Sequence, residues 1–423
     1  MMERKDRDFY GRRTGFRCRD RGRRRRGHRG LSGLAAAKLR VVALEARNRL
    51  GGRAWTLPTA LGKPVDLGCE WLHSAEINPW SEIAVSLGFT LDKTPPDWTS
   101  RIAIHHGEEA NEEWQRVRDE FEDAYERAAK LPYDQPASAL LPPNGRWNKL
   151  FDAISTWANG AELDYVSVKD RQNYDNTALN WRCYDGYGAL MSAYAAGLPI
   201  ERETVVQSID HSGRRIRIST NRGELTAAAV IVTISTNLLA EDAIRFIPAL
   251  PQITDAAQGL PCGVANKCFL ALDGTEPAES YRHLIGRTDR TETGNYQIRP
   301  HGWPMISCYF GGHLSLRLEK DGPEAMAAFA IDELAGIYGN DIRGRLRLLA
   351  SSAWGSDPFA RGSYSCALPA HADDRTILAR PIDDRVFFAG EACSNDHFGT
   401  AHAAYMTAVS AAERIISVLA PAS

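Results

Sequence analysis

Residues 44–53 read Leu44-Glu45-Ala46-Arg47-Asn48-Arg49-Leu50-Gly51-Gly52-Arg53 and continue directly from a short apolar strand at 41–44. In a dinucleotide-binding fold, an acidic residue after the second strand bonds a ribose hydroxyl. Glu45 alone would be weak evidence, since an acid after a strand is usually just solvated. The neighbouring glycines remove side-chain bulk, however, and Arg53 supplies charge-assisted donors for a phosphate. The stretch therefore predicts a nucleotide cofactor site.

Small residues precede this strand. Residues 30–37 indicate the start of a helix, with Gly30 and Gly33 at the position where a glycine loop lets the backbone approach a pyrophosphate. Helix and strand together make half of a βαβ unit.

Hydrophobic periodicity indicates mixed secondary structure further along the chain. Helices are predicted at 112–130, 147–157, 324–338 and 400–418, and strands at 205–210, 215–220, 229–234 and 385–391. In the helix at 112–130, Trp114, Val117, Phe121, Tyr125 and Ala128 share one face, which a packed surface helix explains without any catalytic role.

The whole-chain composition sets the class of protein. A chain of 423 residues is expected to form two interleaved domains with room for a buried cofactor. Its net charge of -2 gives no general attraction to nucleic acid, and its eight cysteines are scattered, as expected of reduced thiols in a cytoplasmic protein. Its longest apolar run is too short to span a membrane. No metal site and no membrane or nucleic-acid partner are expected.

The stretch at 44–53 resembles the segment that follows the second strand in the FAD-dependent amine oxidase family, which includes flavin monoamine oxidases and polyamine oxidases. In that family the acid meets the ribose of FAD, and Gly-Gly-Arg meets the pyrophosphate. The resemblance therefore assigns cofactor-binding roles to Glu45, Arg47, Gly51, Gly52 and Arg53.

Further stretches match the same family in the same order. Residues 66–73 resemble its segment beside the flavin, with His73 where several polyamine oxidases have histidine, although a satisfied, partly buried histidine would explain His73 equally well. Residues 185–190 and 204–206 resemble the returning segment of the FAD domain, in which the backbone of Val206 would meet adenine.

Two stretches resemble the family's catalytic segments. Residues 264–270 match the strand that carries its active-site lysine, here Lys267, although a lysine snorkelling from an edge strand is the alternative. Residues 361–365 match the segment that places a tyrosine, here Tyr364, in front of the flavin. Monoamine oxidases carry a flavin-linked cysteine just before that tyrosine, and because Ser363 stands there, the resemblance implies noncovalent FAD.

The C-terminal stretches 388–391 and 399–405 resemble the family's flavin clamp. Glu391 would bond the ribityl or phosphate region, and Thr400 and Ala401 would offer backbone N–H groups at a helix N-terminus. Tyr405 would be the second wall of an aromatic cage around the amine.

The N-terminus departs from the family. The family opens with an apolar strand running into Gly-x-Gly-x-x-Gly, whereas residues 1–29 are rich in arginine and His28 stands at the first glycine position. A twin-arginine export signal would need an apolar segment next, and a nucleic-acid-binding arm would need interleaved aromatic residues. Out-of-frame translation of a GC-rich gene is a third explanation. With this glycine loop disrupted, FAD binding is expected to be weakened.

The resemblance implies an α/β fold with two discontinuous domains. A Rossmann-like FAD-binding domain would be assembled from 30–75, 176–245 and 356–423, and an α+β substrate-binding domain from 76–175 and 246–355, with 1–29 outside both. The implied reaction is hydride transfer from a small amine or polyamine to flavin N5, followed by hydrolysis of the imine and by reoxidation with dioxygen, which gives hydrogen peroxide.

Two alternatives stay open from the sequence. One is another oxidoreductase of the same superfamily, an amino-acid oxidase or a desaturase. An amino-acid oxidase would need an arginine fork for the substrate carboxylate, and the region 71–73 offers none. The other is a non-catalytic remnant that does not bind FAD. Neither the amine nor the oligomeric state is predicted.

Overall fold

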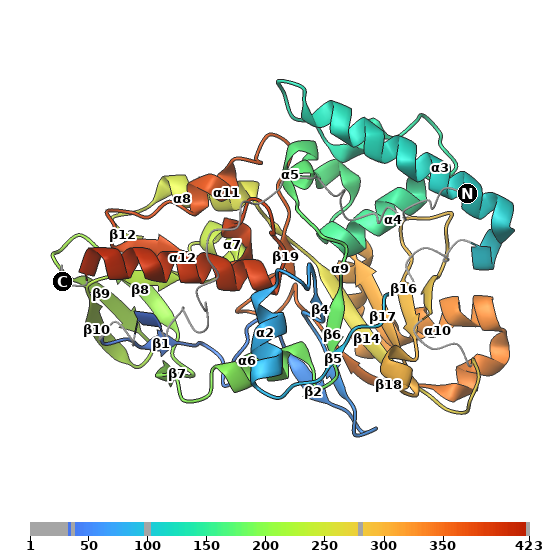
Figure 1. Ribbon diagram of the computed structural model, residues 1–423, viewed down its shortest axis with the longest axis horizontal. Coiled ribbons are helices and arrows are strands. Elements are labelled where there is room, and N and C mark those ends of the chain that lie inside the picture. The colour runs from blue at the N-terminus through green and yellow to red at the C-terminus, as the bar shows by residue number, and fades with distance from the viewer. Residues whose placement is uncertain (1–32, 35–38, 97–102, 278–281, 420–423) are drawn as a thin grey trace.

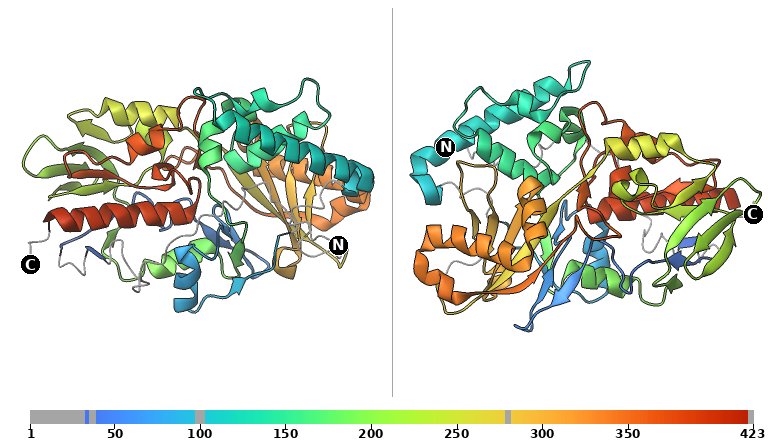
Figure 2. Two further views of the ribbon diagram at one scale, coloured as in Figure 1. Left: turned by 45° about the horizontal axis from the view of Figure 1, so that its top comes forward. Right: turned by 180° about the vertical axis from the view of Figure 1, so that it is seen from behind.

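The computed structural model describes residues 33–34, 39–96, 103–277 and 282–419. The arginine-rich segment 1–29 and Gly30 lie outside the described residues. The described chain forms two lobes side by side, each built on its own sheet system and covered by helices (Figures 1 and 2).

Parallel strand pairs organise the lobe that contains the C-terminal helix. Strand β1 (Ala43–Leu44) pairs with β7 (Ile200–Glu201), and β11 (Val230–Val232) pairs with β20 (Val386–Phe388), so segments far apart in sequence lie together. Helix α12 (Ala401–Leu419) packs on this layer, where Leu34, Phe387 and Ile415 share one core.

A four-stranded sheet in the order β10-β9-β8-β12 completes this lobe. Its strands are β8 (Val206–Asp210), β9 (Ile216–Thr220), β10 (Gly223–Ala227) and β12 (Arg245–Ile247). Helices α7 (Thr236–Ala240), α8 (Pro251–Gly259) and α11 (Asp374–Leu378) cover it. Residues 246–260 pack in this lobe, since Leu250, Ile253 and Leu260 share a core with Ile209 and Phe388, although the sequence-based division assigns them to the other domain.

A five-stranded antiparallel sheet, ordered β15-β16-β17-β14-β18, forms the second lobe. The strands are β14 (Ala265–Leu272), β15 (His283–Ile285), β16 (Asn295–Ile298), β17 (Met305–Gly311) and β18 (Leu346–Ser351). Helices α9 (Gly312–Asp321) and α10 (Pro323–Tyr338) cover its apolar face. Helices α3 (Ala103–Ala129), α4 (Asn148–Asn159) and α5 (Val168–Asn173) form a separate layer with its own core.

Short elements join the lobes. They are strands β2 (Thr56–Pro58), β3 (Pro64–Asp66), β4 (Trp71–Leu72), β5 (Leu91–Asp92), β6 (Trp181–Cys183), β13 (Cys262–Gly263) and β19 (Tyr364–Ser365), and helices α2 (Pro79–Ser86) and α6 (Tyr187–Tyr194). The 3-10 helices are η1 (Ala137–Leu140), η2 (Leu163–Tyr165), η3 (Pro300–Gly302), η4 (Asn340–Arg345) and η5 (Glu391–Cys393).

The predicted α/β class is confirmed, and the strongly periodic segments lie where the sequence places them. The helices predicted at 112–130, 147–157, 324–338 and 400–418 correspond to α3, α4, α10 and α12, and the predicted hairpin is β8 with β9. The strand predicted at 385–391 ends earlier, at Phe388, because Gly390 has a φ of 152° and Glu391 begins a 3-10 turn.

The described residues contain neither a helix suited to span a membrane nor a metal-ligand cluster. None of their helices combines the length and the apolar character that crossing a bilayer requires. In the same residues, no cluster of His, Cys, Asp or Glu side chains is arranged to hold a metal ion.

Candidate active site

A cavity of about 930 Å³ lies between the two lobes and brings the predicted site residues together. The predicted site residues that line this cavity are His73, Lys267, Tyr364, Tyr405, Glu45, Arg47, Gly51, Gly52, Arg53, Val206, Glu391, Thr400 and Ala401. Gly33 is not among its lining residues. It adjoins Leu34, which packs in the core under α12.

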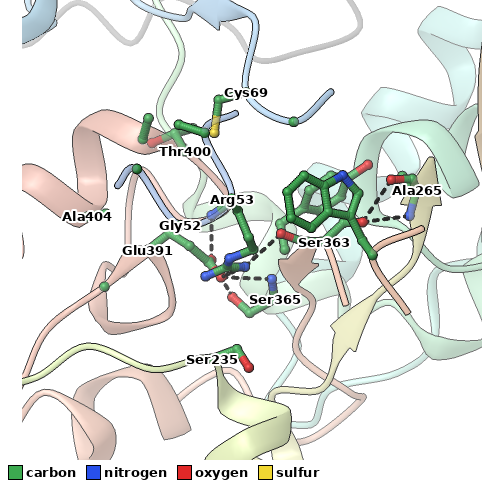
Figure 3. Close-up of a pocket in the computed structure, with 18 of the residues that line it drawn as sticks. Gly52, Arg53, Cys69, Ser235, Ala265, Ser363, Ser365, Glu391, Thr400 and Ala404 are labelled. Atoms are coloured by element: carbon green, nitrogen blue, oxygen red, sulfur yellow. Dashed lines mark hydrogen bonds and ion pairs between the residues drawn. The ribbon is translucent and has the colours of Figure 1, made fainter. Parts of the chain in front are cut away.

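Arg53 and Glu391 form the polar centre of the cofactor side of this cavity (Figure 3). Nη1 of Arg53 donates to Oε1 of Glu391 at 3.0 Å and to the carbonyl oxygen of Ser363 at 2.7 Å. Burial alone would lower the pKa of Arg53, but the Glu391 carboxylate outweighs it and raises that pKa. The Nε and Nη2 groups of Arg53 have no hydrogen-bond partner among the described residues. Because Arg53 lines the cavity, these donors suit a phosphate there.

Glu391 is engaged entirely with the protein. Oε1 accepts from Arg53 and from the backbone N–H of Ser365, and Oε2 accepts from the Ser365 hydroxyl at 2.7 Å and from the N–H of Gly399 at 2.8 Å. A carboxylate offers about four acceptor positions, so these donors use its capacity. Glu391 thus holds Arg53 and the Gly399 turn in place, and the predicted bond to a cofactor hydroxyl has no open acceptor here.

A second buried ion pair, Arg375 with Asp170, is linked to Glu391 through the Ser365 hydroxyl. Arg375, fully buried, donates to Asp170 at 2.6 Å and 2.8 Å and to the Ser365 hydroxyl at 2.8 Å. Asp170 belongs to α5 and Arg375 to α11, so this pair also ties the two lobes together.

Glu45 directly follows β1 and lines the cavity, and its carbonyl oxygen accepts from the N–H of Thr204 at 2.9 Å. Its Oε1 accepts the N–H of Arg47 at 2.8 Å, and the Arg47 guanidinium pairs with Asp357. The turn at Gly51 and Gly52 needs glycine, because Gly51 has a φ of 92° and a Cβ there would lie 2.3 Å from the carbonyl oxygen of Ala54.

Thr400 and Ala401 open α12 toward the cavity, as the sequence predicts. The Thr400 hydroxyl accepts from the N–H of Ala403 at 3.2 Å and donates to the carbonyl oxygen of His397 at 2.6 Å. This arrangement caps the helix and presents its N-terminal end to the cavity, where an anionic group is favoured.

Lys267 is buried and paired. Lys267 lies on β14, an interior strand of the sheet, and its Nζ donates to Oε2 of Glu70 at 2.7 Å and to the carbonyl oxygen of Asp66 at 3.1 Å. The side chain is 9% exposed, which excludes a snorkelling edge lysine.

Glu70 links Lys267 to a second buried cation. Arg182 lies 3.5 Å from Oε1 of Glu70 and donates to Asp92 at 3.1 Å, and Asp92 also contacts His301 at 2.8 Å. Burial alone would raise the pKa of Glu70, but Lys267 and Arg182 outweigh it and lower that pKa to about 2. Burial and Arg182 lower the pKa of His301 to about 4. The cluster therefore holds two cations and two carboxylates, with a neutral histidine.

Glu70→Gln should remove part of the acid sensitivity of the protein. The pKa of Glu70 is lower in the folded protein than in the unfolded chain, so the ionised carboxylate stabilises the fold. This stabilisation is fully present above pH 4.5 and is lost as the pH falls toward 2, where Glu70 becomes protonated. That decrease in pKa corresponds to about 3 kcal/mol. Urea unfolding from pH 7 down to pH 3 should therefore show a shallower decline for Glu70→Gln than for the parent. Glu82→Gln, on the exposed side of α2, is the control, and equal slopes for Glu70→Gln and the parent would contradict the pairing.

His73 lies at the cavity wall and is held by one strong contact. Its Nδ1 lies 2.7 Å from Oδ1 of Asn180, so that nitrogen carries the proton, and burial lowers the pKa of His73. The imidazole is thus neutral. This position suits a buried histidine whose polar group is satisfied by Asn180, and it equally suits a histidine that acts beside the cofactor.

Tyr364 and Tyr405 both line the cavity but are held differently. The Tyr364 hydroxyl donates to the carbonyl oxygen of Trp157 at 2.5 Å and lies 2.9 Å from the Tyr309 hydroxyl. The ring of Tyr405 packs edge-on against Trp80, with 5.4 Å between the ring centroids.

Sequence reasoning missed the polar face of the five-stranded sheet. This face contributes His283, Asn295, Gln297, Ser307 and Tyr309 to the cavity lining. A signal for this face was present at 295–298, where the polar residues Asn295 and Gln297 alternate with Tyr296 and Ile298.

The residues around this cavity fit a flavin dinucleotide. The volume of 930 Å³ lies near the upper end of the range of roughly 300–1,000 Å³ typical of small-molecule sites. Unused Arg53 donors, the N-terminus of α12 and the Gly51 turn supply groups suited to a pyrophosphate, and Glu45 and Val206 line the same cavity.

The chain is similar to known proteins over most of its length. A family model described as flavin containing amine oxidoreductase matches residues 31–172 and 166–416. Polyamine oxidase 4 of Oryza sativa subsp. japonica is 27% identical over 428 residues, covering 91% of this chain and 86% of the relative. Probable polyamine oxidase 4 of Arabidopsis thaliana is 28% identical over 434 residues, covering 91% and 85%.

The fold also matches a solved structure. Cyclohexylamine oxidase from Brevibacterium oxydans IH-35A superposes with a TM-score of 0.75 and 19% sequence identity, covering 92% of this chain and 97% of that chain. At this identity the likeness shows the shared fold.

Proposed function

The chain belongs to the flavin-containing amine oxidoreductase family, and from this premise we propose that it is an FAD-dependent oxidase of a small amine or polyamine. The observation that carries the proposal is that one cavity contains both the cofactor-type groups around Arg53 and the paired Lys267 with Tyr364 and Tyr405. The products would be a carbonyl compound, formed by hydrolysis of an imine, and hydrogen peroxide.

The residues on the Arg53 side would hold the cofactor. Arg53 would donate to its pyrophosphate, Glu45 would accept from a ribose hydroxyl, and the N-terminus of α12 would face its anionic part. Noncovalent binding is supported by Ser363, whose hydroxyl donates to the carbonyl oxygen of Ala265 and accepts from its N–H. The chemistry that a bound flavin supplies is acceptance of a hydride from the carbon next to the amine nitrogen, with dioxygen as the final electron acceptor.

The chain's own residues would position the amine and control charge. Tyr364 is oriented by Trp157 and would offer a ring wall to the amine, with Tyr405 as a second wall. Lys267 keeps its proton donors next to Glu70 and would direct one of them to a water or an oxygen species in the cavity. The closely packed aromatic lining would exclude bulk water.

Anaerobic titration tests this proposal. The full chain, reconstituted with FAD, should lose its yellow colour on addition of an oxidisable amine and regain it when air is admitted, with hydrogen peroxide formed. A protein that binds FAD but keeps its colour with every amine and amino acid would contradict the proposal. Bleaching by amino acids alone would favour an amino-acid oxidase, and failure to bind FAD would favour a non-catalytic remnant.

Replacing both Tyr364 and Tyr405 with alanine should damage amine turnover more than folding. Both rings line the cavity, and an amine held between two rings reacts faster because its orientation is fixed. We expect kcat/KM to fall by about tenfold or more, corresponding to about 1.4 kcal/mol. The double phenylalanine variant, which keeps both rings, should retain most of the activity. Normal oxidation by the alanine variant would show that the tyrosines do not form the amine site.

A further inference from the structure

The five-stranded sheet presents a polar face to the cavity, although its other face is apolar core. Strand pairing places His283 beside Gln297 and Gln297 beside Ser307 in one row. A second row contains Asn295, Tyr309 and Lys267. The residues that alternate with these along the strands, such as Tyr296, Ile298 and Cys308, pack under α9 and α10. We call His283, Asn295, Gln297 and Ser307 the sheet floor.

Arg182 fixes the orientation of the Gln297 amide. The guanidinium carries only donors, so it must face the amide oxygen, and Nη1 of Arg182 lies 2.9 Å from Oε1 of Gln297. The Nε2 donor of Gln297 is left with no hydrogen-bond partner, in a side chain that is 5% exposed and lines the cavity. A buried donor without a partner is costly, which favours a ligand that brings an acceptor to it.

Apart from His283, the residues of the sheet floor have no ionisable side chain. Next to the floor, Lys267 and Arg182 are balanced by Glu70 and Asp92, and His301 is neutral near pH 7. A second ammonium on a substrate would find no unpaired carboxylate here, and a substrate carboxylate would find no unpaired cation. Burying either ion without a partner is strongly unfavourable.

Elsewhere in the cavity the carboxylates are also engaged. Among the described lining residues these are Glu45, Glu70 and Glu391. Glu391 accepts four donors, Glu70 contacts Lys267 and Arg182, and Glu45 lies at the nucleotide side. A polycationic substrate would thus gain no ionic contact along this lining.

We propose that the substrate is a monoamine whose end remote from the amine carries an uncharged oxygen acceptor, such as a hydroxyl, ether or carbonyl, received by Nε2 of Gln297 on the sheet floor. This inference rests on the proposed amine oxidase function and narrows its substrate class. It separates the chain from enzymes that act on polyamines.

Equilibrium binding tests the inference without turnover. The probes are amines of one chain length whose nitrogen-bearing carbon carries two methyl groups and no hydrogen, so that no hydride can leave. Their far ends are hydroxyl, methyl, ammonium or carboxylate, and calorimetry on the FAD-bound full chain gives each Kd. One hydrogen bond predicts that the hydroxyl probe binds about two- to tenfold more tightly than the methyl probe. The ammonium and carboxylate probes should bind at least about tenfold more weakly than the hydroxyl probe.

Two substitutions locate the effect. Gln297→Met keeps the side-chain length but removes the donor, so the preference for hydroxyl over methyl should disappear. Asn295→Asp adds a carboxylate to the floor, where the Asn295 Oδ1 has no hydrogen-bond partner, and should tighten binding of the ammonium probe by about tenfold. Asn340→Asp, the same change at an exposed position, is the matched control and should leave all four Kd values unchanged.

The outcomes separate this inference from the proposed function. If the unmodified protein binds the ammonium or carboxylate probe as tightly as the hydroxyl probe, the inference is wrong whatever the variants do. If the hydroxyl probe binds best but no oxidisable amine bleaches the flavin, the floor is a binding site and the oxidase proposal fails instead.

Discussion

Arg53→Met should weaken FAD binding and should also lower the free energy of unfolding of the FAD-free protein. The substitution removes the cation that faces Glu391 and the Nε and Nη2 donors available to a phosphate. A charge-assisted hydrogen bond contributes about 1.5–3 kcal/mol, so FAD affinity should fall by about tenfold or more. Removing one partner of a buried pair costs about 3–5 kcal/mol, and we expect the lower end because Ser365 and Gly399 still bond Glu391. Flavin fluorescence titration and urea unfolding of the FAD-free protein measure the two effects.

Two further variants make this result specific. Arg287→Met breaks an exposed pair with Asp289 and should leave both the stability of the protein and its FAD affinity close to those of the parent. Arg375→Met removes a buried cation that is outside the cavity lining, so it should destabilise the protein strongly while affecting FAD less than Arg53→Met. If Arg53→Met and Arg375→Met lose FAD affinity equally, Arg53 acts by holding Glu391 and not by contacting the cofactor. An Arg53→Met protein with parental FAD affinity would remove Arg53 from the cofactor site.

The cofactor side of the site could be predicted from sequence because its chemistry lies in short contiguous stretches. Gly51, Gly52 and Arg53 are adjacent in the chain, and the requirement for glycine at a left-handed turn is local. Lys267 was recognisable for a similar reason, since a lysine inside an apolar strand is rarely tolerated without a function.

The partners of these residues could not be predicted, because they are set by contacts between distant segments. Lys267 meets Glu70 across 197 positions, and Arg53 meets Glu391 across 338. The acceptor capacity of Glu391 is used by Ser365 and Gly399, which only the folded chain brings together. The same holds for the sheet floor, where neighbouring strands rather than a motif place His283, Gln297 and Ser307 in one row.

Several sequence-based expectations stay predictions. The cytoplasmic location and the consequence of the disrupted glycine loop depend on residues or measurements beyond the described structure. Cys18 also lies outside it, and the other seven cysteines are free thiols in the structure.

Lys267→Met should slow reduction or reoxidation of the flavin while leaving FAD content nearly unchanged. Lys267 lies on β14 of the five-stranded sheet and pairs with Glu70, whereas Arg53 pairs with Glu391, so cofactor affinity has little reason to fall. Its loss removes the donor that Glu70 now orients, and we expect at least about a tenfold lower rate in one half-reaction, corresponding to about 1.4 kcal/mol of barrier. Stopped-flow absorbance with an oxidisable amine, and then with oxygenated buffer, separates the two half-reactions.

Controls distinguish a chemical role of Lys267 from a structural one. Lys63→Met removes an exposed lysine near Trp303 and should leave both rates unchanged. Glu70→Gln keeps the ammonium but weakens its anchor, so it should slow the same half-reaction by a smaller factor if the position of Nζ matters. After Lys267→Met, Glu70 still faces Arg182 at 3.5 Å, so the fold should survive and the rates can be compared directly. Traces for Lys267→Met that match the parent would show that the Lys267–Glu70 pair serves the packing of β14 alone, because a group that acts on the reacting atoms cannot be removed without changing a barrier.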